Sequence, residues 1–387
     1  MRFLLFSSQI LNILNYARAL SDVDNEFIVT PLVPINRKKD YELMVSRFGI
    51  IESANIHVCP IFLKSPDERF RNLLNPNILL SDFRSIFKTL RSSSPDVVIC
   101  AYILHAFPLI FLKRILNYKL FVIASGGDIN LSEGTVYGLV RRFVYSQSEL
   151  IFAVANNLKT KIRRESGYRA IVIPTGVDPS FFRPLNSKTD LRVKWGLEEG
   201  DFIVLTLCHL IERKCIDDVI KSIRILQDRK FHNTKLIIAG HGPERHALER
   251  LAFELKLKSD TTFLGFVNET EKLELFNLAD VYVIPSYSEG LPFSLIEAMA
   301  CGCVCLSTPV GDIPGVIFEG RNGFLISPRD PENLAKKIEK VVSLPRKQIS
   351  FVQNQARRTV LDNFDFRKLT RHMIYIIVKK LHSLHRN

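Results

Sequence analysis

Two carboxylates separated by seven residues, Glu289 and Glu297, are the side chains of this sequence best placed to bind a small polar molecule. The apolar run at 281–285 predicts a strand, and Pro292 suits the first turn of a helix that begins near Phe293. Glu289 then precedes the helix and Glu297 projects from one of its early turns. Both carboxylates can therefore contact one ligand.

The predicted helix start also suits an anion. Its unpaired backbone N–H groups and the positive end of its dipole would attract a diphosphate, and Gly290 would allow close backbone approach. Carboxylates accept hydrogen bonds from paired sugar hydroxyls. Together these features predict a nucleotide-sugar site. The alternative is a capped helix, because Ser294 and Glu297 fit the S-x-x-E capping box.

The elements that would position this segment follow from the hydrophobic pattern. Short apolar runs alternate with helical patterns along the chain, which predicts mostly parallel sheets covered by helices. Turn-forming residues at 175–188 indicate a domain boundary. We expect an α/β chain with two Rossmann-like β/α/β domains facing a central cleft, at residues 1–178 and 179–364, and a C-terminal helix at 365–387.

Composition and net charge indicate which classes of molecule the protein binds. The chain has 387 residues, of which 47% are hydrophobic, enough for two cores. A net charge of +13 favours an anionic partner. Since no nucleic-acid recognition motif occurs, we expect a phosphorylated ligand or an anionic membrane surface, and no nucleic acid. Seven cysteines without scaffold-like spacing indicate a reducing compartment, the cytoplasm.

We expect no metal ion. Cys301, Cys303 and Cys305 have no histidine nearby in sequence, and strand alternation places Cys303 and Cys305 on one face. Asp22 and Asp24 match a D-x-D pattern found at metal sites, but they lie in a probable loop before the strand at 27–30, so we do not assign them to a metal.

Membrane contact is expected to be peripheral. The apolar run that opens the chain is too short for a signal peptide, and charged residues interrupt the longest apolar tract, at 97–124. Two predicted helices of the first domain are basic and amphipathic, which suits anionic lipid head groups. Their basic and apolar residues are Arg141, Arg142 and Phe143, and Lys159, Lys161, Ile162, Arg163 and Arg164. Solvated helix faces are the alternative.

The stretch from Glu289 to Glu297 resembles the E-x7-E region of family 4 glycosyltransferases, also called glycosyl transferases group 1, which have the GT-B fold. The resemblance is close over 202–326 and looser over 1–173. In that family the first glutamate contacts the donor sugar and the second the ribose, and we assign these roles to Glu289 and Glu297. The backbone that would contact sugar and phosphate is that of Gly290, Leu291, Pro292 and Phe293.

Three further donor-site features follow from the resemblance. Residues 207–215 are similar to the family's G-R-L-x-x-x-K-G loop, whose arginine and lysine hold the donor diphosphate. Lys214 matches the lysine, His209 occupies the arginine position, and Arg213 is a candidate substitute. Gly240 and Gly242 correspond to the family's glycine pair beside the donor, with a simple tight turn as the alternative.

The acceptor side is expected in the first domain. The residues resembling the family's H-G-S-D stretch are Ser125, Gly126, Gly127 and Asp128, with Ser125 in place of the histidine. His105 lies where the family often has a catalytic or positioning histidine; a structural role is the alternative. The family's first-loop glycines are absent, and Ser7, Ser8 and Gln9 are the polar residues there.

The resemblance implies a metal-independent, retaining transfer of a sugar from a UDP- or GDP-sugar, without a further cofactor, to a glycan or lipid-linked acceptor. This would belong to cell-surface polysaccharide or lipopolysaccharide synthesis at the inner face of the membrane. It also implies that the C-terminal helix crosses back to the first domain. The alternative is a non-catalytic GT-B domain that binds a glycan or a partner glycosyltransferase.

Overall fold

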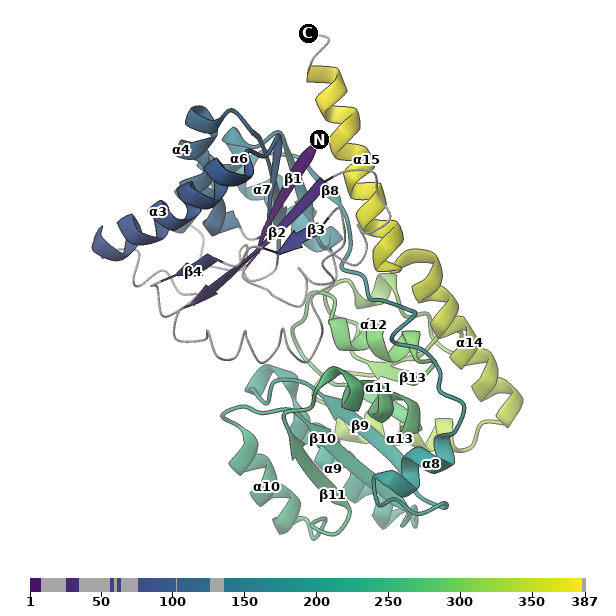
Figure 1. Cartoon of the computed structure of the whole chain (residues 1–387). Coiled ribbons are helices and arrows are strands. Elements are labelled where there is room, and N and C mark those ends of the chain that lie inside the picture. Colours follow the sequence, from purple (N-terminus) through teal and green to yellow (C-terminus); the bar gives the residue numbers. More distant parts are fainter. Residues whose placement is uncertain are drawn as a thin grey trace. The chain divides into compact units, whose positions relative to one another are not determined.

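The computed structural model describes residues 1–7, 26–34, 56–58, 61–63, 76–101, 103–125 and 136–384. The chain forms two compact units, of which the first combines Met1–Pro174 with Phe366–Asn387 and the second is Thr175–Asp365 (Figure 1). Each unit has its own parallel sheet with helices on both faces. The two parallel α/β sheets expected from the alternating pattern are thus present.

The sheet of the first unit has the strand order β3-β2-β1-β5-β6-β7-β8, with β4 paired to β2 and every pairing parallel. Its strands are β1 (Arg2–Ser7), β2 (Glu26–Pro34), β3 (Ile56–Val58), β4 (Ile61–Leu63), β5 (Val97–Ala101), β6 (Lys119–Ala124), β7 (Leu150–Ala153) and β8 (Ala170–Val172). Neighbours β1 and β5 pair in register, with Leu4 opposite Val98. Both faces of these strands are buried, which explains their unbroken apolar runs.

Helices cover both faces of this sheet. One face packs against α3 (Pro76–Ser93), α4 (Ala106–Leu116), α6 (Val136–Gln147) and α7 (Asn156–Ser166). The C-terminal helix α15 (Phe366–Leu384) runs along the other face (Figure 1). Its Met373 and Ile377 are buried in one cluster with Phe3 and Leu5 of β1. The last helix of the chain therefore completes the hydrophobic core of the first unit.

Two residues expected to contact lipid, one on α7 and one on α6, are buried. Ile162, its apolar residue, is buried in the core, and Arg141 of α6 is buried and pairs with Glu165 at 3.4 Å. Neither side chain can therefore reach a lipid. Arg142 and Phe143 of α6 remain exposed.

The second unit has the strand order β11-β10-β9-β12-β13-β14, again with all pairings parallel. The strands are β9 (Phe202–Leu207), β10 (Thr234–Ala239), β11 (Thr261–Gly265), β12 (Val281–Ile284), β13 (Val304–Ser307) and β14 (Phe324–Leu325). The direction of winding reverses between β9 and β12. Ligands of doubly wound sheets bind outside the carboxyl ends of the strands at such a switch point.

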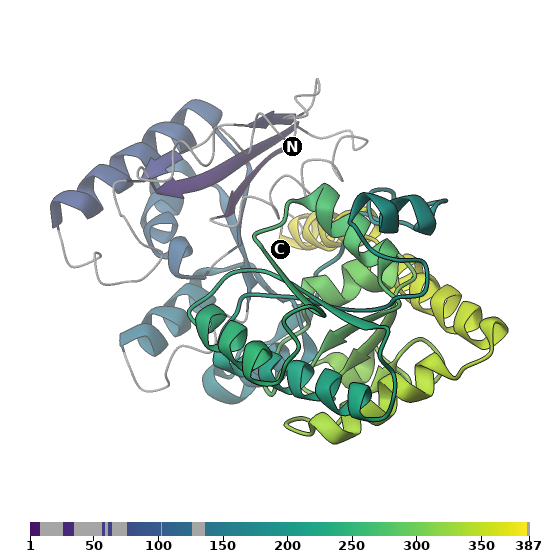
Figure 2. The ribbon, with the colours of Figure 1, turned by 90° about the horizontal axis from the view of Figure 1, so that it is seen from below.

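The helices of this unit lie on both faces of its sheet, as the green part of Figure 2 shows. One face carries α11 (Glu269–Leu278), α12 (Phe293–Ala300) and α14 (Arg346–Asn363); the other carries α9 (Ile216–Asp228), α10 (Arg245–Glu254) and α13 (Pro331–Val342). The short helix α8 (Lys188–Lys194) packs beside α11. Asn268 and Glu271 form a capping box that fixes the start of α11.

Among the helices in the described ranges, none combines the length and the hydrophobicity needed to cross a bilayer.

Candidate functional site

The candidate donor site lies at the carboxyl edge of the second sheet, at its switch point. Because all strands are parallel, the segments after β9, β12 and β13 emerge at the same edge. The segment after β9 carries Lys214 in a short 3-10 helix, Glu212–Lys214, and the segment after β12 carries Glu289. The fold therefore brings together residues separated by 75 positions.

Glu289 forms the centre of this site. Its carboxylate pairs with the Lys214 ammonium through Oε1, and Arg213 Nη1 lies 3.6 Å from Oε2. The Glu289 side chain is only 7% exposed and that of Lys214 13%, so the pair is largely removed from water. Arg213 also donates to the Ser288 carbonyl at 2.9 Å. Both cations, Lys214 and Arg213, thus contact the segment that holds Glu289.

A glycine that the sequence reasoning did not single out shapes this segment. Gly311, in the loop after β13, has φ +61°, and a Cβ there would lie 2.2 Å from the Gly290 carbonyl oxygen and 2.3 Å from that of Glu289. The neighbouring Asp312 N–H donates to the Gly290 carbonyl at 2.9 Å. By contrast, a Cβ on Gly290 would meet no heavy atom within 4 Å. Gly311 is thus needed for the fold of the loop, while Gly290 leaves open space. The sequence signal for the role of Gly311 is its position in the turn-rich run 308–315.

The helix that follows begins at Phe293, as predicted, with Pro292 in the N-cap position. No side chain caps it, and Glu297 binds a lysine instead of the helix start. The capping-box hypothesis for Ser294 and Glu297 is therefore wrong. Within the described part of the chain, no side chain caps the first turn of α12, and such an uncapped helix start suits an anion.

Glu297 lies in a buried ion pair. Lys272 of α11 donates to both carboxylate oxygens, each at 3.0 Å, and the Glu297 side chain is 11% exposed. Burial raises the pKa of the Glu297 carboxyl, and the Lys272 ammonium opposes this shift. Burial also disfavours the Lys272 ammonium, but the carboxylates of Glu297 and Glu269 outweigh it, so the pKa of Lys272 is raised. A carboxylate has further lone pairs, so Glu297 can accept additional hydrogen bonds while it stays paired with Lys272.

The two glycines after β10 have a structural role that the sequence left open. A Cβ on Gly240 would lie 1.8 Å from the Cys208 carbonyl oxygen, and one on Gly242 would lie 2.2 Å from that of Leu210. They therefore allow the loops after β9 and β10 to touch. Beside them the exposed rings of His209 and His241 meet at a centroid distance of 5.1 Å.

In the first unit, His105 and Ser125 follow the neighbouring strands β5 and β6 at the carboxyl edge of the sheet. Burial lowers the pKa of His105 to about 4, so its imidazole is neutral at pH 7. Its position directly before α4 is set by the short 3-10 helix Ile103–His105. Several expected residues lie outside the described ranges: Ser8, Gln9, Asp22, Asp24, Gly126, Gly127 and Asp128.

The three clustered cysteines are core residues. Cys301, Cys303 and Cys305 are buried, and burial raises the pKa of Cys303 to about 12. Because a thiolate is the form that binds metals, such thiols are poor ligands. Across the described part of the chain, no three histidine, cysteine or carboxylate side chains converge as a metal site.

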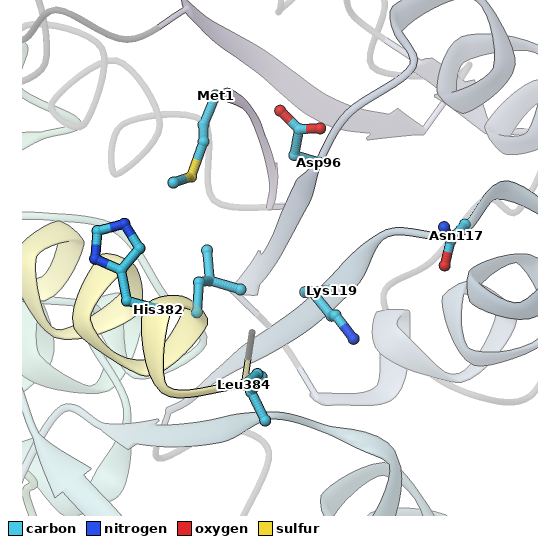
Figure 3. A pocket seen from close by; sticks show the side chains of 7 residues that line it. Met1, Asp96, Asn117, Lys119, His382 and Leu384 are labelled. Atoms are coloured by element: carbon cyan, nitrogen blue, oxygen red, sulfur yellow. The ribbon is translucent and has the colours of Figure 1, made fainter. Parts of the chain in front are cut away.

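The first unit also contains a cavity of about 980 Å³ (Figure 3). Its lining residues are Met1, Asp96, Asn117, Lys119, Leu381, His382 and Leu384. Met1, Asp96 and Lys119 lie at the amino ends of β1, β5 and β6. The cavity is therefore at the edge of the sheet opposite to His105 and Ser125 and is not part of the candidate site.

Residues 187–358 match the family described as glycosyl transferases group 1, and this segment contains Lys214, Glu289 and Glu297. This segment of the second unit is therefore similar to the glycosyl transferases group 1 family. The buried pair of Lys214 and Glu289 lies inside this group 1 region, whereas His105 and Ser125 precede it.

Curated relatives agree with the group 1 match. The chain is 27% identical over 234 residues to an uncharacterized glycosyltransferase of Methanocaldococcus jannaschii, covering 60% of this chain and 57% of the relative. It is 31% identical over 186 residues to the putative glycosyltransferase EpsD of Bacillus subtilis, covering 48% of each. It is 25% identical over 248 residues to the N-acetyl-alpha-D-glucosaminyl L-malate synthase of Bacillus anthracis, covering 61% and 60%. The chain thus spans 48–60% of the length of these relatives.

Solved structures extend the likeness to nearly the whole chain. Sucrose-phosphate synthase from Thermosynechococcus elongatus superposes with a TM-score of 0.81 at 18% identity, covering 99% of this chain and all of that one. HepE of Anabaena, in complex with UDP and glucose, superposes with a TM-score of 0.78 at 17% identity, covering 98% and 100%. At such identities the likeness concerns the fold. It confirms the expected two-domain α/β GT-B fold.

Proposed function

We propose that this chain is a glycosyltransferase that moves a sugar, with retention of configuration, from a UDP- or GDP-sugar to a glycan or lipid-linked acceptor. The observation that carries the proposal is the buried pair of Glu289 and Lys214 at the switch point, next to the uncapped start of α12. In this proposal the Glu289 carboxylate binds sugar hydroxyls, and the Lys214 ammonium and the backbone N–H groups at the helix start bind phosphate.

The proposed chemistry uses charge stabilisation. Lys214 and the first turn of α12 stabilise the negative charge that develops on the leaving phosphate, while Glu289 orients the sugar. The bond between the anomeric carbon and the phosphate oxygen breaks, and the acceptor oxygen bonds to the anomeric carbon from the same face. The acceptor proton passes to the leaving phosphate. No protein nucleophile is required.

The roles of the remaining residues are part of the proposal. Glu297 binds the ribose while it stays paired with Lys272, and His209 and Arg213 lie beside the diphosphate. The backbone from Gly290 to Phe293 contacts sugar and phosphate. In the first unit, neutral His105 would position the reacting hydroxyl, and the stretch from Ser125 to Asp128 would contact the acceptor. Because Lys214 stabilises the negative charge on the leaving group, we propose that neither a metal ion nor another cofactor is needed.

Names of relatives support the substrate classes. HepE of Anabaena was solved with UDP-glucose, and a relative in Mycolicibacterium smegmatis, 24% identical over 258 residues, is named as GDP-mannose-dependent. A Bacillus subtilis relative, 26% identical over 216 residues, is named for teichuronic acid biosynthesis. We therefore propose a role in cell-surface polysaccharide or lipopolysaccharide synthesis, at the cytoplasmic face of the membrane.

The test is nucleotide release from a panel of UDP-, GDP- and ADP-sugars, with lipid extract as acceptor and with or without EDTA. Glu289→Gln is the test variant, and Glu254→Gln, exposed on α10, is its matched control. We expect release from one donor that resists EDTA, survives Glu254→Gln and is lost in Glu289→Gln. An NMR assignment of the product anomer then tests retention. Nucleotide binding without turnover on any acceptor would favour the non-catalytic GT-B alternative.

A further inference from the structure

The first unit carries a group of exposed apolar side chains on α4 and α6. Phe111 and Ile115 on α4 are 50% and 68% exposed, and Leu139 and Phe143 on α6 are 71% and 40% exposed. Phe107, half-buried on α4, lies between them and the core. These five residues are called the α4–α6 patch below.

The patch is one continuous surface. Phe107, Phe111 and Ile115 follow each other at four-residue spacing along α4, and Leu139 and Phe143 do so along α6, so each set lies on one helix face. The Phe107 ring lies 5.3 Å from that of Phe111 and 6.1 Å from that of Phe143, and Phe111 and Phe143 lie 6.5 Å apart. Scattered exposed apolar residues need no explanation, but a contiguous cluster of them indicates an interaction surface.

The surroundings of the patch are basic. Neither α4 nor α6 contains an aspartate or glutamate. Arg114 and Arg142 are exposed and immediately precede Ile115 and Phe143 in sequence. The adjacent helix α3 packs on α4; it contains one carboxylate, Asp82, and exposes three cations, Arg84, Lys88 and Arg91.

We propose that the α4–α6 patch docks the protein on the surface of an anionic lipid bilayer. The aromatic and aliphatic side chains would enter the boundary between head groups and acyl chains, and the arginines would bind lipid phosphates. A second copy of the chain fits the patch less well. In a two-fold dimer through this surface the arginines of both copies would be brought together, with no carboxylate on α4 or α6 to compensate them.

This surface overlaps only in part with the one expected from the sequence. Arg142 and Phe143 of α6 are common to both, whereas α7 drops out because its apolar residue Ile162 is buried, and α4 is added. The proposal also stands apart from sugar transfer, because it is tested by binding alone.

The experiment is flotation of the full-length protein with vesicles of phosphatidylcholine alone or with 30% phosphatidylglycerol. The test variants are Leu139→Ser/Phe143→Ser, which removes apolar contact, and Arg114→Gln/Arg142→Gln, which removes charge. The control, Arg250→Gln/Phe253→Ser, alters an exposed arginine and an exposed phenylalanine on α10 of the second unit. Thermal unfolding of each variant verifies that it is folded; since all the altered side chains are exposed, we expect melting temperatures close to that of the wild type.

We expect the wild type and the α10 control to bind anionic vesicles equally, and at least tenfold more strongly than neutral ones. Each patch variant should lose binding by about tenfold or more, and 0.5 M NaCl should weaken the wild type through screening. Equal flotation of the patch variants and the wild type would overturn the proposal, as would equal binding to neutral and anionic vesicles. Light scattering showing a dimer that Leu139→Ser/Phe143→Ser dissociates, without vesicle binding, would assign the patch to self-association.

Discussion

Glu289 and Lys214 form a buried ion pair across the switch point of the second sheet, joining the segment after β12 to the segment after β9. The pair fixes the position of the cation before any donor is bound. A preorganised cation needs little rearrangement when charge develops on a leaving phosphate. Loss of the Lys214 ammonium should therefore slow transfer.

Replacing Lys214 with Met should reduce turnover of the donor identified in the sugar panel by about 100-fold or more, the usual effect of removing one charge-stabilising donor. Lys214→Arg should retain a substantial part of the activity, because it keeps the charge. Lys221→Met, which removes an exposed lysine of α9, is the control and should have little effect. Steady-state nucleotide release measures all three. Activity of Lys214→Met close to that of the control would show that Lys214 does not stabilise the leaving group.

The second prediction concerns the pair of Lys272 and Glu297. Lys272→Met leaves the Glu297 carboxylate buried without its cation, and the pKa of Glu297, already raised by burial, should rise further. The folded variant then takes up a proton that the unfolded chain, with a glutamate pKa near 4.5, does not bind. Its free energy of unfolding should therefore fall by about 3 kcal/mol or more relative to the wild type at pH 8, and recover part of this loss as the pH falls toward 5.

Urea unfolding of wild type and Lys272→Met at pH 5, 6.5 and 8 measures this effect. Lys336→Met, an exposed lysine of α13, serves as the control. The same loss of stability at all three pH values would mean that Glu297 does not take up a proton when its partner is removed. The double variant Lys272→Met/Glu297→Leu should be more stable than Lys272→Met alone, because the buried Glu297 carboxylate is no longer present without its cation.

The sequence alone predicted much of this site, since its local signals are strong. The strand at 281–284 and the helix start at Phe293 follow from an apolar run and a proline, and the structure confirms both. The partner of Glu297 could not be predicted, because Lys272 lies 25 residues away on another helix and the approach depends on how α11 packs on α12. The local S-x-x-E pattern favoured a capping box instead. Periodicity and turn residues report on neighbours along the chain, not on which helices meet.

The glycines show the same limit. The sequence indicates a donor-site role for Gly240 and Gly242, with a tight turn as the alternative, but the carbonyls of Cys208 and Leu210 that require these glycines belong to another loop. Gly311 was overlooked because the atoms it must avoid, the carbonyl oxygens of Glu289 and Gly290, are contributed by the segment after β12. The local sequence around a glycine does not distinguish one that is needed for a tight turn from one that is needed because another loop passes close to it.

The third prediction compares Gly311 with Gly290. Gly311→Ala should reduce the free energy of unfolding by about 2 kcal/mol or more, because its φ is positive and its Cβ would collide with backbone oxygens. Gly290→Ala has open space and should change stability by less than about 1 kcal/mol, yet weaken UDP or GDP binding if phosphate approaches the backbone there. Urea unfolding and calorimetric titration separate the two effects. Unchanged nucleotide affinity in Gly290→Ala would remove this residue from the proposed donor contacts.

The fourth prediction concerns His209, which occupies the position of an arginine in the group 1 pattern. Its ring is exposed and stacks edge-on with that of His241 at the carboxyl edge of the sheet. His209→Arg would add a permanently charged, forked donor beside the proposed diphosphate and should tighten UDP or GDP binding by about tenfold. His232→Arg adds the same charge at the amino edge, just before β10, and should leave the affinity nearly unchanged. A gain that is equal in both variants would reflect the overall charge of the chain, whereas a gain confined to His209→Arg would place the diphosphate beside this loop.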